Sequence, residues 1–206
     1  VKSRLAYGKG GVEGLSGYEM GDFRAKLEMV GLTKEVIDKA TEPEIGRIID
    51  SYNNIPVFYN GDISNVVGRN TTLDGYNLGL KYQCVEYVKR YYYFVYDHKM
   101  TDSYGHAKEF FDASLPDKMF NLKRGLYQFR NGSEYRPMPG DILIFDAHPM
   151  NPFGHIGIVT YSKDEKIEII QQNVYQQTRN SFYVGKHGHK YYVLDAGVLG
   201  WLRKGG

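Results

Sequence analysis

The alternation of apolar and polar residues divides the chain into a helical beginning and a strand-rich remainder. Across residues 22–52 apolar side chains, Ile48 and Ile49 among them, recur at roughly helical spacing, and breaks fall at Gly31 and Pro43. This spacing predicts two or three short helices.

Two further signals refine the N-terminal region. Thr33 followed by Glu35 is typical of a helix start, because a threonine hydroxyl caps free N–H groups and an acidic side chain suits the positive end of the helix dipole. The glycine-rich residues 1–20 show no sustained period, which indicates a loose arm.

The rest of the chain combines helices with strands and turns. Apolar side chains at spacings of three and four predict a helix in KYQCVEYVKRYYYF, residues 81–94, and GHAKEFFDASL, residues 105–115, predicts another. The polar, glycine-spaced residues 66–80 are expected to form a loop. Short strands are expected within residues 53–65, 142–145, 190–197 and 199–204, and a hairpin within residues 154–175. Helices first and antiparallel strands after them predict an α+β fold.

Composition removes several classes of function. The chain of 206 residues is 42% hydrophobic and 24% charged, and no apolar run approaches the roughly 20 residues that span a bilayer. Its net charge of +2 includes no basic block of the kind that marks nucleic-acid binders. One cysteine excludes internal disulfides and multi-cysteine zinc or iron–sulfur sites. We therefore expect no nucleic-acid or membrane partner.

That single cysteine, Cys84, lies where the helix of residues 81–94 begins. Free N–H groups and the helix dipole favour a thiolate at this end, and the polar loop before it is expected to leave the thiol accessible. The alternative is that Cys84 is a small buried hydrophobe, as lone cysteines commonly are.

His155 is the candidate partner of this thiol. It begins an alternating strand and is flanked by Gly154 and Gly157, which would leave space for another group to approach closely. The remaining histidines are expected to be solvated or to cap loops; they are His98, His106, His148, His187 and His189.

The predicted hairpin supplies an orienting group for His155. A turn centred on residues 163–164 pairs positions whose numbers sum to about 327. Either Gln171 or Asn173 would then face His155, while Gln172 points to the other face. A thiol, an imidazole and an orienting amide together form a cysteine-hydrolase triad. The alternative is that these polar residues merely end an edge strand.

Four ordered motifs, YQCVEYVKRYYY, PGDILIFD, GHIGIV and IIQQN, resemble those of the CHAP family. This is the cysteine, histidine-dependent amidohydrolase and peptidase branch of the papain-like NlpC/P60 group. The wording around the cysteine is similar to that of the amidase domains of glutathionylspermidine synthetase/amidases. The resemblance implies a papain-like NlpC/P60/CHAP fold, with N-terminal helices packed on an antiparallel β-sheet. It also implies a cysteine amidase domain over residues 55–206, preceded by an arm and short helices of unknown role in residues 1–54.

Carried over to this chain, the resemblance makes Cys84 the nucleophile and His155 the base. Gln83 and the backbone N–H of Cys84 would stabilise the oxyanion. The family's usual glutamate after the histidine strand is replaced by Gln171, which with Asn173 is the candidate orienting residue. A neutral amide stabilises an imidazolium less than a carboxylate does, so reduced activity or inactivity is an open alternative.

Two further expectations concern binding. Glu86 is expected to be a structural or substrate-side carboxylate. Some family members bind calcium in the loop before the cysteine, but the matching positions here lack the carboxylates that such a site needs, so we expect no metal and no cofactor. Those positions are Gly75, Asn77, Gly79 and Lys81.

The resulting hypothesis is a monomeric amidase that cuts bacterial peptidoglycan peptide through a thioester and works in the periplasm or outside the cell. A glutathionylspermidine-type amidase, which would be cytoplasmic, is an alternative with a small amide substrate. An antibacterial effector with an immunity or inhibitor protein as partner, and an inactive wall-binding module, are two others.

Overall fold

The computed structural model describes residues 17–205, and it describes side chains from Phe23 onward. The chain divides into two compact units after Arg47. The predicted arm lies mostly outside the described residues, but its last four residues, 17–20, belong to a helix, so that part of the prediction is wrong.

The first unit is a pair of helices, α1 (Gly17–Met29) and α2 (Lys34–Ala40). The Thr33 hydroxyl accepts a hydrogen bond from the Val36 N–H and caps α2, as predicted. Arg24 of α1 pairs with Asp38 of α2 at 2.5 Å, which joins the two helices.

The second unit contains helix α3 (Cys84–Tyr96), one turn of 3-10 helix, η1 (Ala107–Phe110), and the strands. The strands are β1 (Ile48–Tyr52), β2 (Ile55–Phe58), β3 (Arg69–Thr71), β4 (Asn77–Leu80), β5 (Phe120–Asn121), β6 (Leu126–Arg130), β7 (Ile142–Phe145), β8 (His155–Lys163), β9 (Lys166–Ile170), β10 (Arg179–His187), β11 (Lys190–Val193) and β12 (Val198–Arg203).

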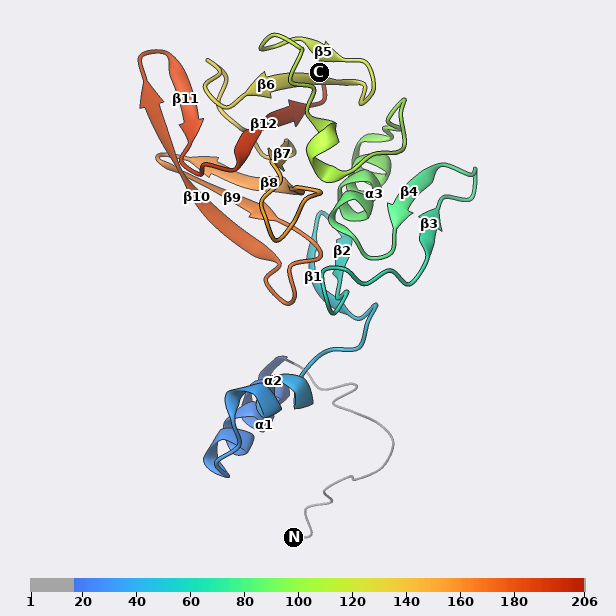
Figure 1. Ribbon diagram of the computed structural model, residues 1–206, viewed down its shortest axis with the longest axis vertical. Coiled ribbons are helices and arrows are strands. Elements are labelled where there is room, and N and C mark those ends of the chain that lie inside the picture. Colours follow the sequence, from blue (N-terminus) through green and yellow to red (C-terminus); the bar gives the residue numbers. More distant parts are fainter. Residues whose placement is uncertain (1–16, 206) are drawn as a thin grey trace. The chain divides into compact units, whose positions relative to one another are not determined.

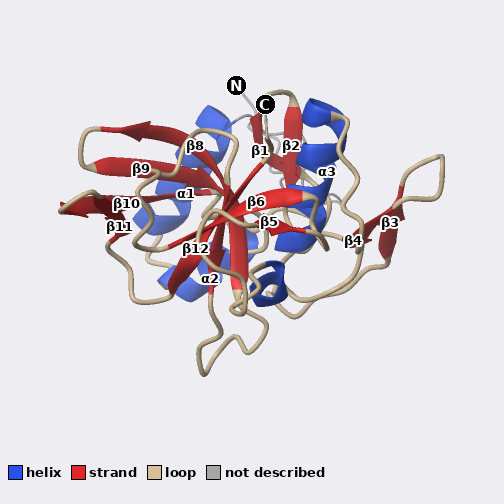
Figure 2. Ribbon diagram, turned by 90° about the horizontal axis from the view of Figure 1, so that it is seen from above, coloured by secondary structure: helices blue, strands red, loops and turns tan. Residues whose placement is uncertain are grey.

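Eight of these strands form one sheet in the order β11-β10-β9-β8-β7-β12-β6-β5, and neighbouring strands are antiparallel. Figure 1 shows α3 and the strand pairs β1-β2 and β3-β4 to one side of this sheet. The β3-β4 ribbon projects from the body beside α3 (Figure 2). The predicted α+β class is confirmed.

The chain beyond β6 closes most of this sheet into a ring. Gly132 N–H donates to Tyr191 O at 2.9 Å, and Tyr191 N–H donates to Ser133 O at 2.7 Å. The Asn131 side chain adds hydrogen bonds to both backbone groups of Val193. Strand β11 is therefore covered along this edge, which removes an unpaired edge that would otherwise favour association with another chain.

The two faces of the sheet pack into different cores. Inside the ring lies an apolar cluster that we call the barrel core, built around Trp201. Its buried members are Phe129, Leu143, Val159, Ile167, Ile169, Val184, Val193, Val198 and Trp201. The opposite face packs on α3, whose Tyr87, Val88 and Tyr91 are fully buried in a second cluster, the helix core. Cys84 belongs to this second cluster.

Three sequence predictions fail in this unit, two where strands replace other elements and one where a helix is shortened. Ile48 and Ile49 lie in β1, where Ile48 pairs with Phe58, because β-branched residues suit a paired strand. Residues 66–80 form β3 and β4 rather than a loop. Gly79 permits this ribbon to lie against α3, since an added Cβ would come within 3.3 Å of the Glu86 backbone.

The helix predicted over residues 105–115 is reduced to η1. The Gln128 carboxamide accepts from the Asp112 N–H and donates to the Asp112 carbonyl, both at 2.8 Å, so these groups are unavailable to a helix. Arg124 also binds the Glu109 carbonyl at 3.2 Å. Tertiary hydrogen bonds therefore override the local helical pattern.

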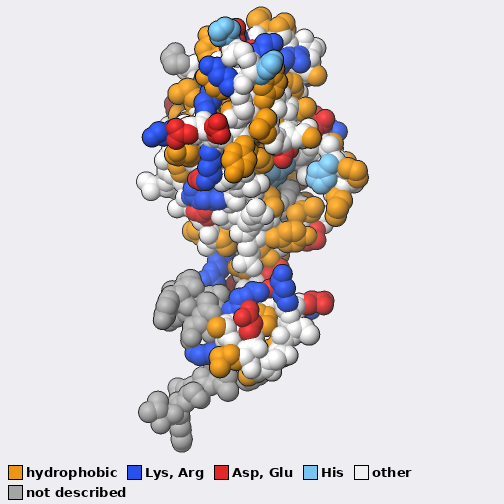
Figure 3. All heavy atoms as spheres, turned by 90° about the vertical axis from the view of Figure 1, so that its left-hand side faces the viewer, with side chains coloured by type: hydrophobic (Ala, Val, Ile, Leu, Met, Phe, Trp, Pro, Cys, Tyr) orange, Lys and Arg blue, Asp and Glu red, His pale blue; other side chains and the backbone are white. Residues whose placement is uncertain are grey.

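On the side of the second unit drawn in Figure 3, Lys and Arg side chains lie among Asp and Glu side chains. None of the helices in the described part of the chain is long and apolar enough to cross a bilayer.

Candidate active site

The only cysteine occupies the first position of α3. Gln83 is the N-cap residue and does not cap the helix with its side chain. The Cys84 thiol instead lies against backbone N–H groups of Cys84, Val85 and Ile156. Ile156 directly follows His155 on β8, so the thiol lies against the residue next to the histidine, where α3 packs on β8. The thiol is enclosed, with Cys84 only 8% exposed, which corrects the prediction of an accessible group.

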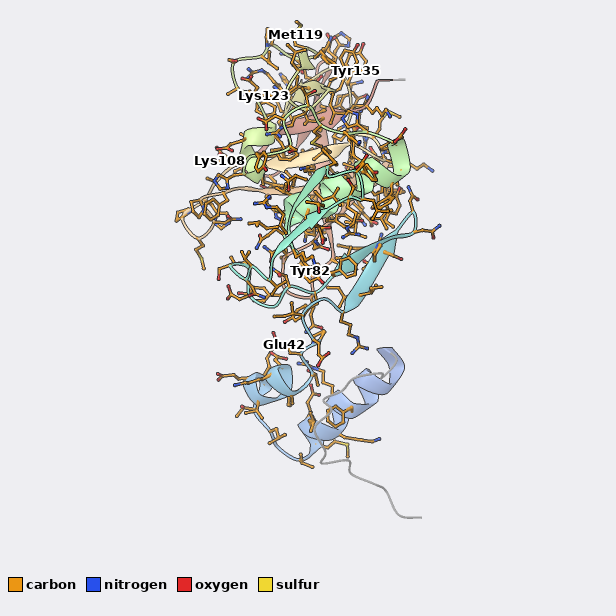
Figure 4. All side chains as sticks on the ribbon, turned by 90° about the vertical axis from the view of Figure 1, so that its right-hand side faces the viewer. Glu42, Tyr82, Lys108, Met119, Lys123 and Tyr135 are labelled. Carbon is orange, nitrogen blue, oxygen red and sulfur yellow. The ribbon has the colours of Figure 1, made fainter. Side chains whose placement is uncertain are left out.

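His155 is held by close backbone packing on both sides. A Cβ at Gly154 would come within 2.5 Å of the Phe145 carbonyl, and one at Gly157 would come within 2.9 Å of the Ile170 carbonyl. The Lys108 N–H of η1 donates to Phe153 O at 3.0 Å (Lys108 is labelled in Figure 4). The flanking glycines thus admit neighbouring strands of the protein itself.

The Gln171 side chain fixes the tautomer of His155. Gln171 Nε2 donates to the Gln177 carbonyl at 3.0 Å, and a carbonyl can only accept, so Gln171 Oε1 is the atom that faces His155. His155 Nε2 lies 3.0 Å from that oxygen and must therefore carry the proton. Nδ1 is left with the lone pair that a general base needs.

The hairpin register explains how Gln171 reaches His155. Strands β8 and β9 pair with residue sums of 328 at Ile158 and Ile170 and 329 at Lys163 and Lys166, with a bulge between them. The predicted sum of 327 is therefore one to two residues too small. Continuing the register from Ile158 places His155 level with residue 173, so Gln171 contacts it from the diagonal position.

Asn173 contacts the residue before the cysteine rather than His155. Its Nδ2 donates to Gln83 Oε1 at 2.6 Å, and its Oδ1 accepts from Asn60 at 2.7 Å. The Gln83 Nε2 donates to the Asn65 carbonyl at 2.8 Å and to the Ile63 carbonyl at 3.3 Å. The Gln83 carboxamide is thus committed on both sides to protein partners.

Glu86 lies in a buried polar network behind the thiol. Its carboxylate is 2.7 Å from Arg90 Nε and accepts from Asn70 at 2.9 Å and from Gln172 at 2.8 Å. With a relative exposure of 0%, Glu86 has no surface with which to contact a substrate. Of the two roles expected for this residue, the substrate-side one disagrees with the structure, because the carboxylate is already enclosed by an arginine and two amides.

Comparison with protein families locates this site within a known domain. The model of the CHAP domain matches residues 75–173, a stretch that includes Cys84, His155 and Gln171. Residues 75–173 are a CHAP domain. The match to this family supports hydrolase activity on amide bonds.

Two kinds of curated relative each match more than half of the chain. The chain is similar to the bifunctional glutathionylspermidine synthetase/amidase of Escherichia coli, with 32% identity over 145 residues. It is also similar to trypanothione synthetase of Crithidia fasciculata, with 27% identity over 119 residues. The matches cover 63% and 58% of this chain but only 23% and 18% of those relatives, so the chain spans less than a quarter of the proteins it matches.

Among solved structures, the crystal structure of Ly7917 aligns with a TM-score of 0.24 and 21% sequence identity. The alignment covers 34% of this chain and 29% of that chain. A similarity of this size does not establish a shared fold.

Burial sets the charge states of Cys84 and His155. Desolvation raises the pKa of Cys84 to about 11, although the N–H groups of Ile156, Val85 and Cys84 act in the opposite direction. Desolvation also lowers the pKa of the half-buried His155 to about 4, against the opposing effect of the hydrogen bond that His155 donates to Gln171. The N–H groups of the helix terminus act on the thiol pKa in the predicted direction, but burial outweighs them, so the predicted net decrease of the pKa is wrong. Both groups rest uncharged near neutral pH.

This arrangement suits nucleophilic catalysis assisted by a general base. A neutral imidazole can take the thiol proton as sulfur attacks a carbonyl, and the resulting imidazolium can protonate the leaving amine. Within residues 23–205, no group of three or more His, Cys, Asp or Glu side chains is placed to bind a metal ion.

Sequence reasoning missed the network behind the thiol. The signal that could have revealed it is the spacing of Glu86 and Arg90, four residues apart on the helix, which favours an ion pair. Two of the histidines outside the site contact backbone groups of the protein. His98 Nε2 lies 2.8 Å from the Arg124 carbonyl. His148 Nδ1 accepts from the Met150 N–H at 3.3 Å.

Proposed function

We propose that this chain is a cysteine-dependent amide hydrolase with Cys84 as nucleophile and His155 as general base. The observation that carries the proposal is the hydrogen bond from His155 Nε2 to Gln171, because it leaves His155 Nδ1 unprotonated. His155 directly precedes Ile156, whose backbone N–H contacts the thiol. We assign the domain of residues 55–206 to the papain-like NlpC/P60 group, since its nucleophile begins a helix and its base begins a strand.

The reaction proceeds through a thioester. Cys84 Sγ attacks the amide carbonyl while its proton passes to His155 Nδ1, and that proton then leaves with the amine as the C–N bond breaks. Water, deprotonated by the same imidazole, hydrolyses the thioester and restores the thiol. The backbone N–H of Cys84 is the first oxyanion donor. Gln83 can add a second only if it gives up one of its bonds to the carbonyls of Asn65 and Ile63.

The first candidate substrate is glutathionylspermidine, because the more similar curated relative is named for an amidase of that compound. Asp62 and Asp146 support it. Both are exposed, and they directly neighbour Ile63, which accepts from Asn173, and Phe145, which pairs with His155. Carboxylates so placed suit a cationic polyamine. An enzyme with this substrate would work in the cytoplasm.

The second candidate substrate is peptidoglycan peptide. Exposed apolar side chains of the loops on either side of the site favour it, because they offer contacts to a longer chain than a small conjugate needs. These side chains are Ile63, Val66, Met150, Phe153 and Tyr175. This substrate would place the protein in the periplasm or outside the cell, where an effector with an immunity protein would also act.

A substrate panel tests the proposal. Purified protein and its Cys84→Ala variant are incubated with glutathionylspermidine and, separately, with purified sacculi, and released amines are quantified. The expected result is amine release from glutathionylspermidine by the parent chain alone. Release from sacculi alone would replace the substrate but keep the chemistry. The absence of any difference between parent and variant on either substrate would contradict the hydrolase and indicate a binding module.

A further inference from the structure

Gln172 makes a buried polar connection between the two sides of the site. Its side chain points away from His155, on the face opposite to that of Gln171, and it is 1% exposed. Gln172 Oε1 accepts from the Phe58 N–H at 2.8 Å and from Arg90 Nη2 at 3.3 Å. Gln172 Nε2 donates to the Gln83 carbonyl at 3.1 Å and to Glu86 Oε2 at 2.8 Å. Every donor and acceptor position of this carboxamide is therefore occupied.

These contacts join the residue before the nucleophile to the residue after the one that orients the base. Gln83 immediately precedes the nucleophile Cys84, and Gln172 immediately follows Gln171, which orients the base His155. The bond between the Gln83 carbonyl and Gln172 thus spans the boundary between α3 and the end of β9 by a single side chain.

The Glu86–Arg90 ion pair holds Gln172 in this position. Arg90 also donates to the Pro56 carbonyl at 2.8 Å, and its guanidinium lies 4.7 Å from the centre of the Phe58 ring. The orientation of the carboxamide is fully determined, because Glu86 can only accept and Arg90 can only donate. A buried ion pair contributes little net stability when apolar packing could replace it, so stability alone does not account for this network.

We propose that Gln172 is a positioning residue that sets the distance and direction between the Cys84 thiol and His155. The inference rests on the proposed function of the site. Reacting groups must be aligned closely, and a displacement of about 1 Å can cost roughly 100-fold in rate. Glu86 and Arg90 act through Gln172, and none of the three contacts the reacting atoms.

The test compares the pH dependence of Cys84 alkylation by iodoacetamide in the parent chain, Gln172→Met, His155→Ala and Gln128→Met. Methionine keeps the volume of glutamine and removes its hydrogen bonds. Gln128 is the matched control, because it lies on β6, outside the site, and is 0% exposed. Its carboxamide is hydrogen-bonded to Asp112 and Asn121. Rates are divided by the folded fraction measured by circular dichroism under the same conditions.

We expect Gln172→Met to slow alkylation at neutral pH about tenfold or more and to move its pH profile toward that of His155→Ala. Gln128→Met should change the rate per folded molecule by less than about twofold. If Gln172→Met keeps the parent profile while His155→Ala slows the reaction, the inference is overturned and the proposed function stands. If His155→Ala leaves the rate unchanged, the proposed function itself fails.

A second variant covers the case in which Gln172→Met does not fold. The double exchange Glu86→Gln with Gln172→Glu keeps one carboxylate beside Arg90 and one amide beside that carboxylate, but it removes the donor to the Gln83 carbonyl. We expect this protein to fold and still to show the slowed alkylation profile, because the connection to Gln83 is lost. A folded exchange variant with the parent profile would contradict the inference.

Discussion

The two cores on either side of the sheet contain different kinds of side chain. The barrel core around Trp201 is apolar, and its buried members carry no titratable group. The helix core on the opposite face includes the Cys84 thiol and three buried tyrosines of α3, and it adjoins the Glu86–Arg90 pair. A sheet with an apolar face can be stabilised without restricting what the other face does.

The comparison separates stability from chemistry. In the barrel core, substitutions should change the free energy of unfolding and leave the reaction alone. On the face that packs on α3, strand β8 carries His155, and Gln171 directly follows strand β9. Substitutions there should therefore change the reaction first. Single substitutions on the two sides test that division, from the largest effect on turnover to the smallest.

Cys84→Ala should reduce turnover to background, a loss of more than about 10,000-fold, because no other group can form the acyl-enzyme. The change removes one small atom from an enclosed site, so the free energy of unfolding should fall by no more than about 1–2 kcal/mol. Turnover and urea denaturation measure the two effects. Retained turnover with a large loss of stability would make Cys84 a packing residue.

His155→Ala should lower kcat/KM by about 100- to 10,000-fold, the usual contribution of a general base. Burial lowers the pKa of this histidine to about 4, so in the parent chain the base stays neutral, and the rate should hold down to about that pH. A pH profile of kcat/KM checks both points. An acid limb with its midpoint near the ordinary histidine value would show that the ring is solvated.

Gln171→Glu should move the acid limb of that profile to higher pH, because a carboxylate next to Nε2 favours the imidazolium and raises the pKa of His155. At pH values below the limb, a histidine pKa higher by one leaves about tenfold less of the neutral base. The variant also loses the donor to the Gln177 carbonyl. An unmoved limb would show that Gln171 does not contact the imidazole in solution.

Trp201→Ala should have the smallest effect on turnover. Trp201 is fully buried in the barrel core, and its removal should cost about 3–5 kcal/mol in the free energy of unfolding. The rate per folded molecule should change less than about twofold. Comparable losses in stability and in rate per folded molecule would show that the two faces of the sheet are coupled.

The sequence predicted the elements whose signals are local. The α3 helix and the β8–β9 hairpin follow from periodicity and turn residues, and the Thr33 cap follows from a single side chain. The β3-β4 ribbon and the shortened η1 depend on distant groups, such as the Gln128 carboxamide bound to Asp112, that no local pattern reveals.

The site shows the same division. Strand parity and hairpin register are local properties, and they indicated that Gln171 or Asn173 faces His155, of which Gln171 does. The pairing of Cys84 with His155 followed from the resemblance to the CHAP family. The charge states were not predictable, because burial depends on how α3 packs on β8, and it outweighs the helix terminus at the thiol. The partners of Gln172 come from β2, α3 and the segment before α3, which only the fold brings together.

The pH dependence of Cys84 alkylation in the parent chain and in His155→Ala tests the central claim most directly. Burial raises the pKa of the thiol to about 11, so an unassisted Cys84 should react only as the pH approaches that value. We predict that the parent chain reacts readily at neutral pH and that His155→Ala loses this reactivity and reacts only under strongly alkaline conditions. Superimposable profiles for the two proteins would contradict the assignment of His155 as the base that activates Cys84.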